Sequence, residues 1–142
     1  MQIVTDKNYK KFHKYLMNMM AQNSRKTLVI GASVNPLRFS NICIHDLVAH
    51  QIQVEALGLK PGEVSGVTIQ TGQPPLNDIH TVTLYIGPRH QPQYYDYILG
   101  LKPIRIIFNP GTWNDELAEM AVKQGIKVEN ECTLVMLSNG GF

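Results

Sequence analysis

The stretch KTLVIGASVNPLRFS, residues 26–40, decides how the rest of the chain is interpreted. It opens on the apolar run LVI and passes through the small residues GAS into a segment with helical periodicity. A buried strand, a tight turn and a helix with free N–H groups at its start form a common anion-binding unit. The stretch therefore predicts a strand, a phosphate-binding turn and the beginning of a helix.

The glycine pattern of this turn is incomplete. The dinucleotide-binding fingerprint G-x-G-x-x-G has three glycines, but only Gly31 is in place here, with Ser33 and Pro36 at the other two positions. Ser33 still allows close approach and adds a hydroxyl donor, and Pro36 fixes φ at a helix start. Arg38 adds a guanidinium beside the turn. On these residues alone, an ordinary strand–loop–helix connection is the alternative.

Length and composition indicate one globular domain that can bury its own core. The chain has 142 residues and a formal net charge of +2, with basic residues spread along it. Nucleic-acid binding needs a concentrated basic face, so we expect no nucleic-acid partner, whereas a small anionic ligand suits this charge. We predict a helical extension over residues 1–25 and a Rossmann-like domain over residues 26–142.

The chain shows no targeting or metal-binding pattern. Its first residues lack the apolar core of a signal peptide, and no segment approaches membrane-spanning length. The two cysteines, Cys43 and Cys132, are far apart and match no metal spacing. We therefore expect a cytoplasmic protein with reduced thiols, no metal and no membrane partner.

Periodicity predicts strands that alternate with helices. Before the first strand, residues 6–22 form an amphipathic helix, and we expect its apolar face, Phe12, Leu16 and Met19, to pack on the main sheet. The opposite face, with Lys7, Lys10, Lys11 and Lys14, is expected to be solvated.

Strands are predicted at 27–32, 53–57, 81–86, 104–108 and 127–129, and helices at 39–50, 92–99, 113–124 and 132–137. Residues 58–77 read as a loop with a short strand at 67–70, and Thr112 is predicted to cap the helix after it.

This alternation predicts an α/β fold: a Rossmann-like, doubly wound, mostly parallel sheet with helices on both faces, preceded by the N-terminal helix. Ligands of such sheets bind beyond the carboxyl ends of the strands. The candidate segments are therefore residues 31–38, 58–60, 87–89 and 109–114, where most Gly–Pro clusters of the chain fall.

The strand ends also limit the ligand. A nicotinamide dinucleotide site uses an acid at the end of the second strand to hold the ribose, but Glu55 lies inside that strand and Lys60 follows it. A lysine there suits a phosphorylated ribose, either the 2′-phosphate of NADP or the 3′-phosphate of coenzyme A. Arg38, Lys60 and Arg89 would then surround one anionic nucleotide.

The chain resembles the small single-domain CoA-binding proteins, which share a Rossmann-like domain with the succinyl-CoA synthetase alpha subunit. The resemblance covers residues 26–137, and weaker matches lie at Lys60, Arg89, Gly111 and Cys132. It rests on the opening motif G-A-S-x-x-P-x-R-x-S, which is matched by Gly31, Ala32, Ser33, Pro36, Arg38 and Ser40.

This resemblance implies that the CoA pyrophosphate lies over the turn 31–33 and that the adenosine with its 3′-phosphate lies toward Lys60. Family members often carry Asn-Pro before that lysine, where this chain has Gly58 and Leu59. From the motif and the strand ends together, the candidate ligand-binding residues are Gly31, Ala32, Ser33, Pro36, Arg38, Ser40, Lys60, Gly87, Arg89, Asn109 and Gly111.

No catalytic set stands out in the sequence. The synthetase relatives use a phosphorylated histidine in a separate domain, so we expect no synthetase activity and no catalysis. Trp113 is expected either to stack on an adenine or to pack under the following helix, and Cys132 either to meet a bound thiol or to fill a small buried space. The main prediction is non-catalytic binding of CoA or acyl-CoA. The alternatives are an NAD(P)-binding redox sensor or oxidoreductase, and an interaction protein with a vestigial site.

Overall fold

The computed structural model describes residues 6–23 and 25–142 and confirms the α/β prediction. Helices separate β1 from β2, β5 from β6 and β6 from β7, whereas β2 to β5 follow one another without a helix; two short 3-10 turns come after β5. In chain order, the elements are α1 (Asp6–Asn23), β1 (Thr27–Ile30), α2 (Phe39–Ala49), β2 (Val54–Leu57), β3 (Gly62–Val64), β4 (Val67–Gln70), β5 (Thr81–Leu84), η1 (Pro88–His90), η2 (Pro92–Tyr94), α3 (Tyr95–Gly100), β6 (Arg105–Phe108), α4 (Asp115–Lys123), β7 (Lys127–Asn130) and α5 (Thr133–Asn139).

The strands form one seven-stranded sheet in the order β3-β4-β2-β1-β5-β6-β7. Every neighbouring pair is parallel except β3 and β4, which pair antiparallel. Apart from β3, the sheet has the strand order 3-2-1-4-5-6 of the doubly wound dinucleotide-binding fold. The chain builds outward from β1 to β4 and then returns to add β5 on the other side. The switch point, where such folds bind ligands, therefore lies between β1 and β5.

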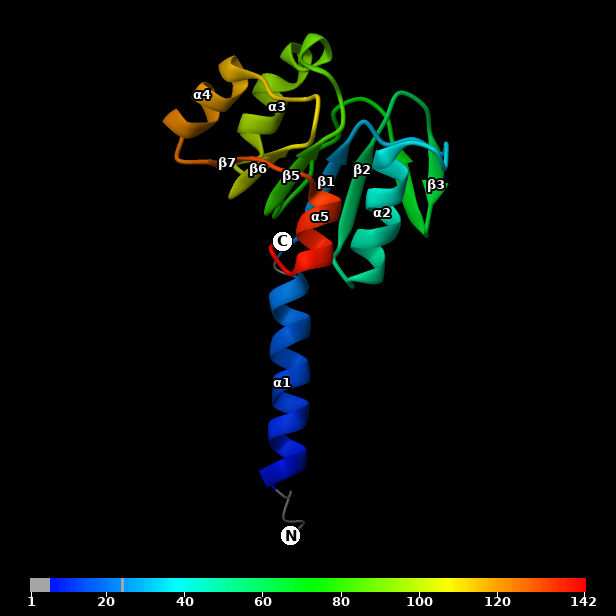
Figure 1. Cartoon of the computed structure of the whole chain (residues 1–142), viewed down its shortest axis with the longest axis vertical. Helices are drawn as coiled ribbons and strands as arrows, with labels where there is room; N and C mark the ends of the chain where they lie inside the picture. Colours follow the sequence, from blue (N-terminus) through cyan, green and yellow to red (C-terminus); the bar gives the residue numbers. More distant parts are fainter. Residues whose placement is uncertain (1–5, 24) are drawn as a thin grey trace.

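Helices cover both faces of the sheet, as predicted. Alternation along β1 sends Leu28 and Ile30 into a core shared with α3 and α4, and sends Val29 into a core shared with α2 and α5. Figure 1 shows α2 and α5 next to each other on one face, and these two helices contact each other. The central strands β1, β5 and β6 are buried at every position, as expected for parallel strands covered on both sides.

The N-terminal helix is confirmed, but its predicted packing is wrong. Figure 1 shows α1 projecting away from the sheet. Phe12 is 63% exposed and Leu16 is 42% exposed, so the apolar face does not cover the sheet. The side chain of Met19 lies outside the described residues. Periodicity predicts that a helix has an apolar face, but it does not say what that face touches.

A β-hairpin replaces the predicted loop after β2. The short strand at residues 67–70 is confirmed as β4, whereas β3 was not predicted. Val64 pairs with Val67 across a two-residue turn in which Ser65 and Gly66 both have positive φ, 51° and 80°. Hairpin turns with positive φ at both central residues match the twist of the paired strands. The sheet therefore ends in β3 at one edge and β7 at the other.

Candidate functional site

The sheet register brings the predicted binding segments to one edge. Ile30 pairs with Leu57 and Leu84, and Leu84 pairs with Phe108, so these four strands end side by side. The residues that follow them therefore leave the sheet next to one another, at the carboxyl edge of β1, β2, β5 and β6. We call this region the carboxyl edge; it contains the segments 31–40, 58–60, 85–91 and 109–114.

Glycines allow the turn after β1 to lie close to both neighbouring strands. Gly31 has φ of +96°, and a Cβ atom there would lie 2.9 Å from the carbonyl oxygen of Tyr85. On the other side, a Cβ atom at Gly58 would collide with the carbonyl oxygen of Ala32. Close backbone approach on both sides thus requires glycine at these two positions, and it fixes the position of the turn between β2 and β5.

Some backbone N–H groups of the turn 31–33 are bonded inside the protein, so they are not available to a pyrophosphate lying over the turn. Gly31 N and Ala32 N both donate to the Leu57 carbonyl oxygen, at 3.0 and 2.8 Å. Among residues 25–142, the N–H groups of Ser33, Phe39 and Ser40 have no hydrogen-bond partner. The last two belong to the first turn of α2, where a helix offers free donors to an anion.

Three cations lie on loops of the carboxyl edge. Arg38, Lys60 and Arg89 are exposed, and none forms an ion pair with another described residue. The segments 31–40, 58–60 and 85–91 contain no Asp or Glu. Because three loops of this edge carry positive charges without ion-pair partners among the described residues, the carboxyl edge favours an anionic ligand.

Exposed apolar side chains border the same edge, and the sequence analysis did not single them out. Val34 lies against Gly62 of β3, and both lie on the β2 side of the edge. The sequence could have indicated them, because large apolar residues are unusual in loops and at the first position of a helix. Exposed apolar side chains beside charged ones are typical of a binding site. These side chains are Val34 (58% exposed), Leu37 (86%), Phe39 (69%) and Leu59 (89%).

Two predicted site residues turn their side chains inward. Ser40 and Asn109 are 3% and 2% exposed. The Asn109 amide nitrogen donates to Thr83 Oγ1 and to the Leu84 carbonyl oxygen at 2.7 and 2.8 Å, while its oxygen accepts from Thr133 N at 2.9 Å. Asn109 thus joins β6 to β5 and to the start of α5, and its side chain has no free hydrogen for a ligand.

The other predicted residues lie at the carboxyl edge with different degrees of exposure. Ala32 is buried, Gly31, Ser33 and Gly87 are half-buried, and Pro36 and Gly111 are exposed. Ser33 Oγ accepts from Asn35 N at 3.1 Å and so helps to shape the loop before α2.

The family comparison agrees with this geometry. A profile described as CoA binding domain matches residues 25–138. The chain belongs to the CoA-binding domain family. The match begins two residues before β1 and ends within α5, so it includes the whole sheet and excludes α1.

Solved structures share the fold of this CoA-binding domain. An uncharacterized protein is 46% identical, with 83% of this chain and 98% of that chain covered and a TM-score of 0.81. A hypothetical protein from Pyrococcus horikoshii OT3 is 23% identical over 89% of each chain, with a TM-score of 0.73. A protein from Thermus thermophilus is 15% identical, with 92% of this chain and 98% of that chain covered and a TM-score of 0.71. No curated protein matches the chain.

A polar network that the sequence did not predict holds the loops of the CoA-binding domain together. Gln91 is fully buried, and its side-chain nitrogen donates to the carbonyl oxygens of Ile86 and Thr112, at 3.0 and 2.7 Å. Asn114 donates to Gln91 Oε1 at 3.0 Å, and its own oxygen accepts from the first N–H groups of α4. Asn114 is therefore the N-cap of α4, and the predicted cap at Thr112 is wrong.

Trp113 packs against the domain. Its ring meets that of Phe108 edge-on with centroids 5.0 Å apart, and its Nε1 donates to Asp115 Oδ1 at 2.8 Å. These contacts favour the packing alternative over a ring free to stack on an adenine.

The cysteines differ in their surroundings. Burial raises the pKa of the Cys43 thiol to about 12, so this group is protonated at neutral pH and is no nucleophile. Cys132 is half-buried at the N-cap of α5. Among the described residues, no group of three or more His, Cys, Asp or Glu could hold a metal ion. None of the described helices has the length and apolar character needed to span a bilayer.

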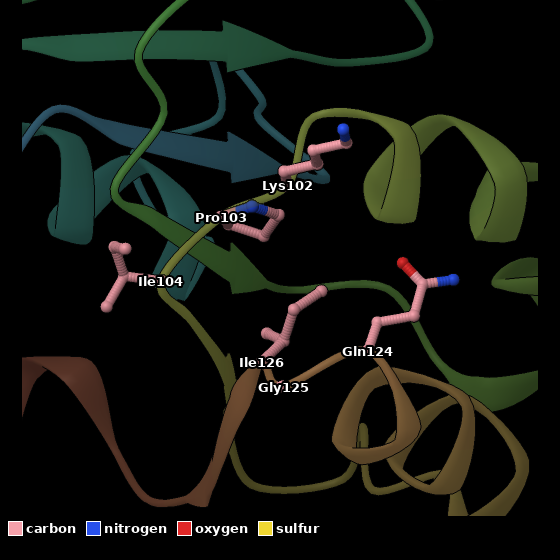
Figure 2. A pocket seen from close by; sticks show the side chains of 6 residues that line it. All are labelled: Lys102, Pro103, Ile104, Gln124, Gly125 and Ile126. Carbon is pink, nitrogen blue, oxygen red and sulfur yellow. The ribbon is translucent and has the colours of Figure 1, made fainter.

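A pocket of about 380 Å³ lies away from the carboxyl edge (Figure 2). Its lining residues directly precede β6 and β7 or end α4, so the pocket opens at the amino edge of the sheet. It is therefore no part of the predicted site. The pocket is lined by Lys102, Pro103, Ile104, Gln124, Gly125 and Ile126.

Proposed function

We propose that this CoA-binding domain holds CoA or an acyl-CoA at the carboxyl edge without transforming it. The observation that carries the proposal is that the strand register brings the loops with Arg38, Lys60 and Arg89 to one edge, beside the tightly packed turn after β1. None of these three cations forms an ion pair with another described residue. CoA has a pyrophosphate and a 3′-phosphate that complement these cations. The free N–H groups at the start of α2 would add donors for the pyrophosphate.

Within the NAD(P) alternative, NAD has less support than NADP. An NAD site needs a free acid at the end of β2, but Glu55 lies within the strand. Its oxygens are already engaged by Lys26 Nζ at 3.5 Å and by Gln70 Nε2 at 2.9 Å. Lys60 follows β2, and its positive charge would attract a phosphate group. These features favour a phosphorylated ribose, which CoA and NADP share and NAD lacks.

A non-catalytic role is supported by the chemistry of the site. Among the described residues, no Ser, Thr or Cys side chain of the carboxyl edge is hydrogen-bonded to a His, Asp or Glu, and the Cys43 thiol is buried and protonated. We further propose that the protein works in the cytoplasm, where both cysteines, which form no disulfide, would stay reduced.

The primary test is thermal stabilisation by CoA, acetyl-CoA, NAD, NADP and ATP, since a ligand that binds the native state raises Tm. We expect the largest shift with CoA or acetyl-CoA, and acetyl-CoA should be recovered unchanged by mass spectrometry. A Tm shift with NAD or NADP, and none with CoA or acetyl-CoA, would overturn the CoA proposal. Cleavage of the thioester would overturn the non-catalytic role.

A paired experiment tests the position of the ligand. Calorimetry should show that Lys60→Ala weakens CoA binding by about tenfold or more, the value of one charge-assisted hydrogen bond. The same variant should leave the affinity for 3′-dephospho-CoA unchanged, because the group facing Lys60 is then missing. Lys123→Ala, in the last turn of α4 and far from the carboxyl edge, is the matched control. Equal losses for both ligands would remove Lys60 from the 3′-phosphate site.

A second variant tests the proposed contact with the pyrophosphate. Arg38→Ala should weaken CoA and 3′-dephospho-CoA alike by about tenfold or more while leaving Tm without ligand unchanged, because Arg38 is exposed and makes no side-chain cap to α2. Unchanged CoA affinity would show that Arg38 does not contact the ligand.

A further inference from the structure

Helix α1 presents an apolar face with no partner in the described molecule. The helix lies outside the family match and projects from the domain (Figure 1). Its described side chains, those of residues 6–17 and 20, are all exposed. The exposed apolar side chains include Tyr9 (59%), Phe12 (63%), Leu16 (42%) and Met20 (59%).

Most of the charge and apolar area is separated around the helix, with the exposed Tyr15 and Met17 in the two gaps between the arcs. At about 100° per residue, Tyr9, Phe12, Leu16 and Met20 fall within an arc of about 80°. The four lysines fall within an arc of about 100° whose centre is nearly opposite. These lysines are Lys7, Lys10, Lys11 and Lys14. A helix with an apolar face and a lysine-rich face is typical of segments that lie in a membrane interface.

Self-pairing of two α1 helices fits less well. A coiled coil needs about three to four heptads with charged residues flanking the seam, and α1 has 18 residues. Asp6 is the only acid in the helix, so two copies could form few ion pairs between them. Lysines with so few acids on their own helix complement a negative surface better than a second copy of the helix.

We propose that α1 binds the surface of an anionic lipid bilayer. Phe12, Leu16 and Met20 would enter the boundary between headgroups and acyl chains, with Tyr9 at the interface, where tyrosine is favoured. The lysines would remain in the headgroup layer, attracted by anionic lipids. This binding is peripheral, and it revises the expectation that lipids play no part. That expectation rested on the lack of a segment of membrane-spanning length, and a helix that lies in the interface does not need that length.

The attachment point of α1 keeps this surface apart from the ligand site. The helix leads into the amino end of β1, whereas Gly31 and Arg38 follow its carboxyl end. Lipid binding and CoA binding therefore occupy opposite ends of the domain, and neither requires the other.

The test is sedimentation of the full chain with vesicles, either phosphatidylcholine alone or phosphatidylcholine with phosphatidylglycerol at a ratio of about three to one, in low and high salt. We expect binding to the anionic vesicles only, and salt should weaken it. Phe12→Glu with Leu16→Glu should reduce the partition coefficient at least about tenfold, as should replacement of the four lysines by Gln. Val122→Glu, an exposed apolar residue on α4, and Lys123→Gln are the matched controls.

Several results would overturn the proposal. The protein could bind neutral and anionic vesicles equally, or it could bind neither. Both α1 variants could also bind anionic vesicles as strongly as the unchanged protein. A concentration-dependent dimer in analytical ultracentrifugation that Phe12→Glu abolishes would assign the apolar face to a second copy instead. CoA affinity measured with the same α1 variants should stay unchanged, so loss of lipid binding is distinguishable from failure of the proposed ligand site.

Discussion

At the scale of single residues, Gly31 has the strictest requirement. Its φ of +96° strains any residue with a side chain, and the nearby Tyr85 carbonyl oxygen leaves no room for a Cβ atom. We predict that Gly31→Ala lowers the free energy of unfolding by about 2–3 kcal/mol in urea titration. Gly72 also has positive φ, +74°, but no atom lies within 4 Å of an added Cβ, so Gly72→Ala should cost only about 1 kcal/mol. Equal costs would mean that close approach adds nothing at Gly31.

His80 should give the stability of the protein a pH dependence. Its pKa is lowered from the ordinary histidine value of 6.5, first by burial and then by the nearby Arg105 charge. The unfolded chain then binds a proton more readily than the folded one, so the stability from this group is complete above pH 6.5. It declines as the pH falls below that value, until the folded protein also becomes protonated. Urea titrations between about pH 5 and 8 should show this decline, and His80→Gln should flatten it. His90→Gln, at an exposed position, should retain the decline.

Single side chains also show which features of the candidate site could not be predicted from the sequence. The segments of the candidate site were predictable because glycines and cations follow the strands in sequence. The inward orientation of Asn109 was not, because its partners Thr83 and Thr133 lie on other elements. The acceptor for the N–H groups of Gly31 and Ala32 likewise lies on β2. Hydrogen bonds between residues distant in sequence leave no local pattern.

At the scale of elements, Asn109 links three of them. We predict that Asn109→Leu lowers the free energy of unfolding by at least about 3 kcal/mol, because Thr133 N and the Leu84 carbonyl lose a buried partner. Chemical denaturation measures the loss. Asn130→Leu, at the exposed end of β7, should change stability by less than about 0.5 kcal/mol. A small effect at Asn109 would mean that water replaces its hydrogen bonds.

The elements themselves were largely predictable from apolar runs and periodicity, with ends that differ by at most three residues. The largest difference is at the helix predicted from residue 92, which begins as the 3-10 turn η2 and becomes α3 only at Tyr95. The missed strand β3, with the sequence GEV, is too short to show alternation. The Ser65–Gly66 dipeptide before β4 was the available sign of a hairpin. Two candidate caps close in sequence, Thr112 and Asn114, could be distinguished only by the bonds that Asn114 makes to α4.

At the scale of the whole molecule, α1 and the domain should behave independently. Removal of residues 1–24 should shift Tm by less than about 3 °C and leave CoA affinity unchanged, because the described α1 side chains are exposed. Arg25 must be retained, since its Nη1 donates to the Phe142 carbonyl oxygen at 2.6 Å. Differential scanning calorimetry and calorimetric titration provide the two measurements. A large loss of Tm would show that α1 belongs to the folded core.

The two outer strands also govern how folded copies meet at high concentration. β3 has only three residues, and one of them is glycine. β7 carries Lys127 and Glu129, which form an ion pair at 2.9 Å. Short or charged outer strands are poor templates for a strand from another chain. These outer strands therefore disfavour fibril growth by strand addition at either edge, although the mostly parallel sheet is open at both ends.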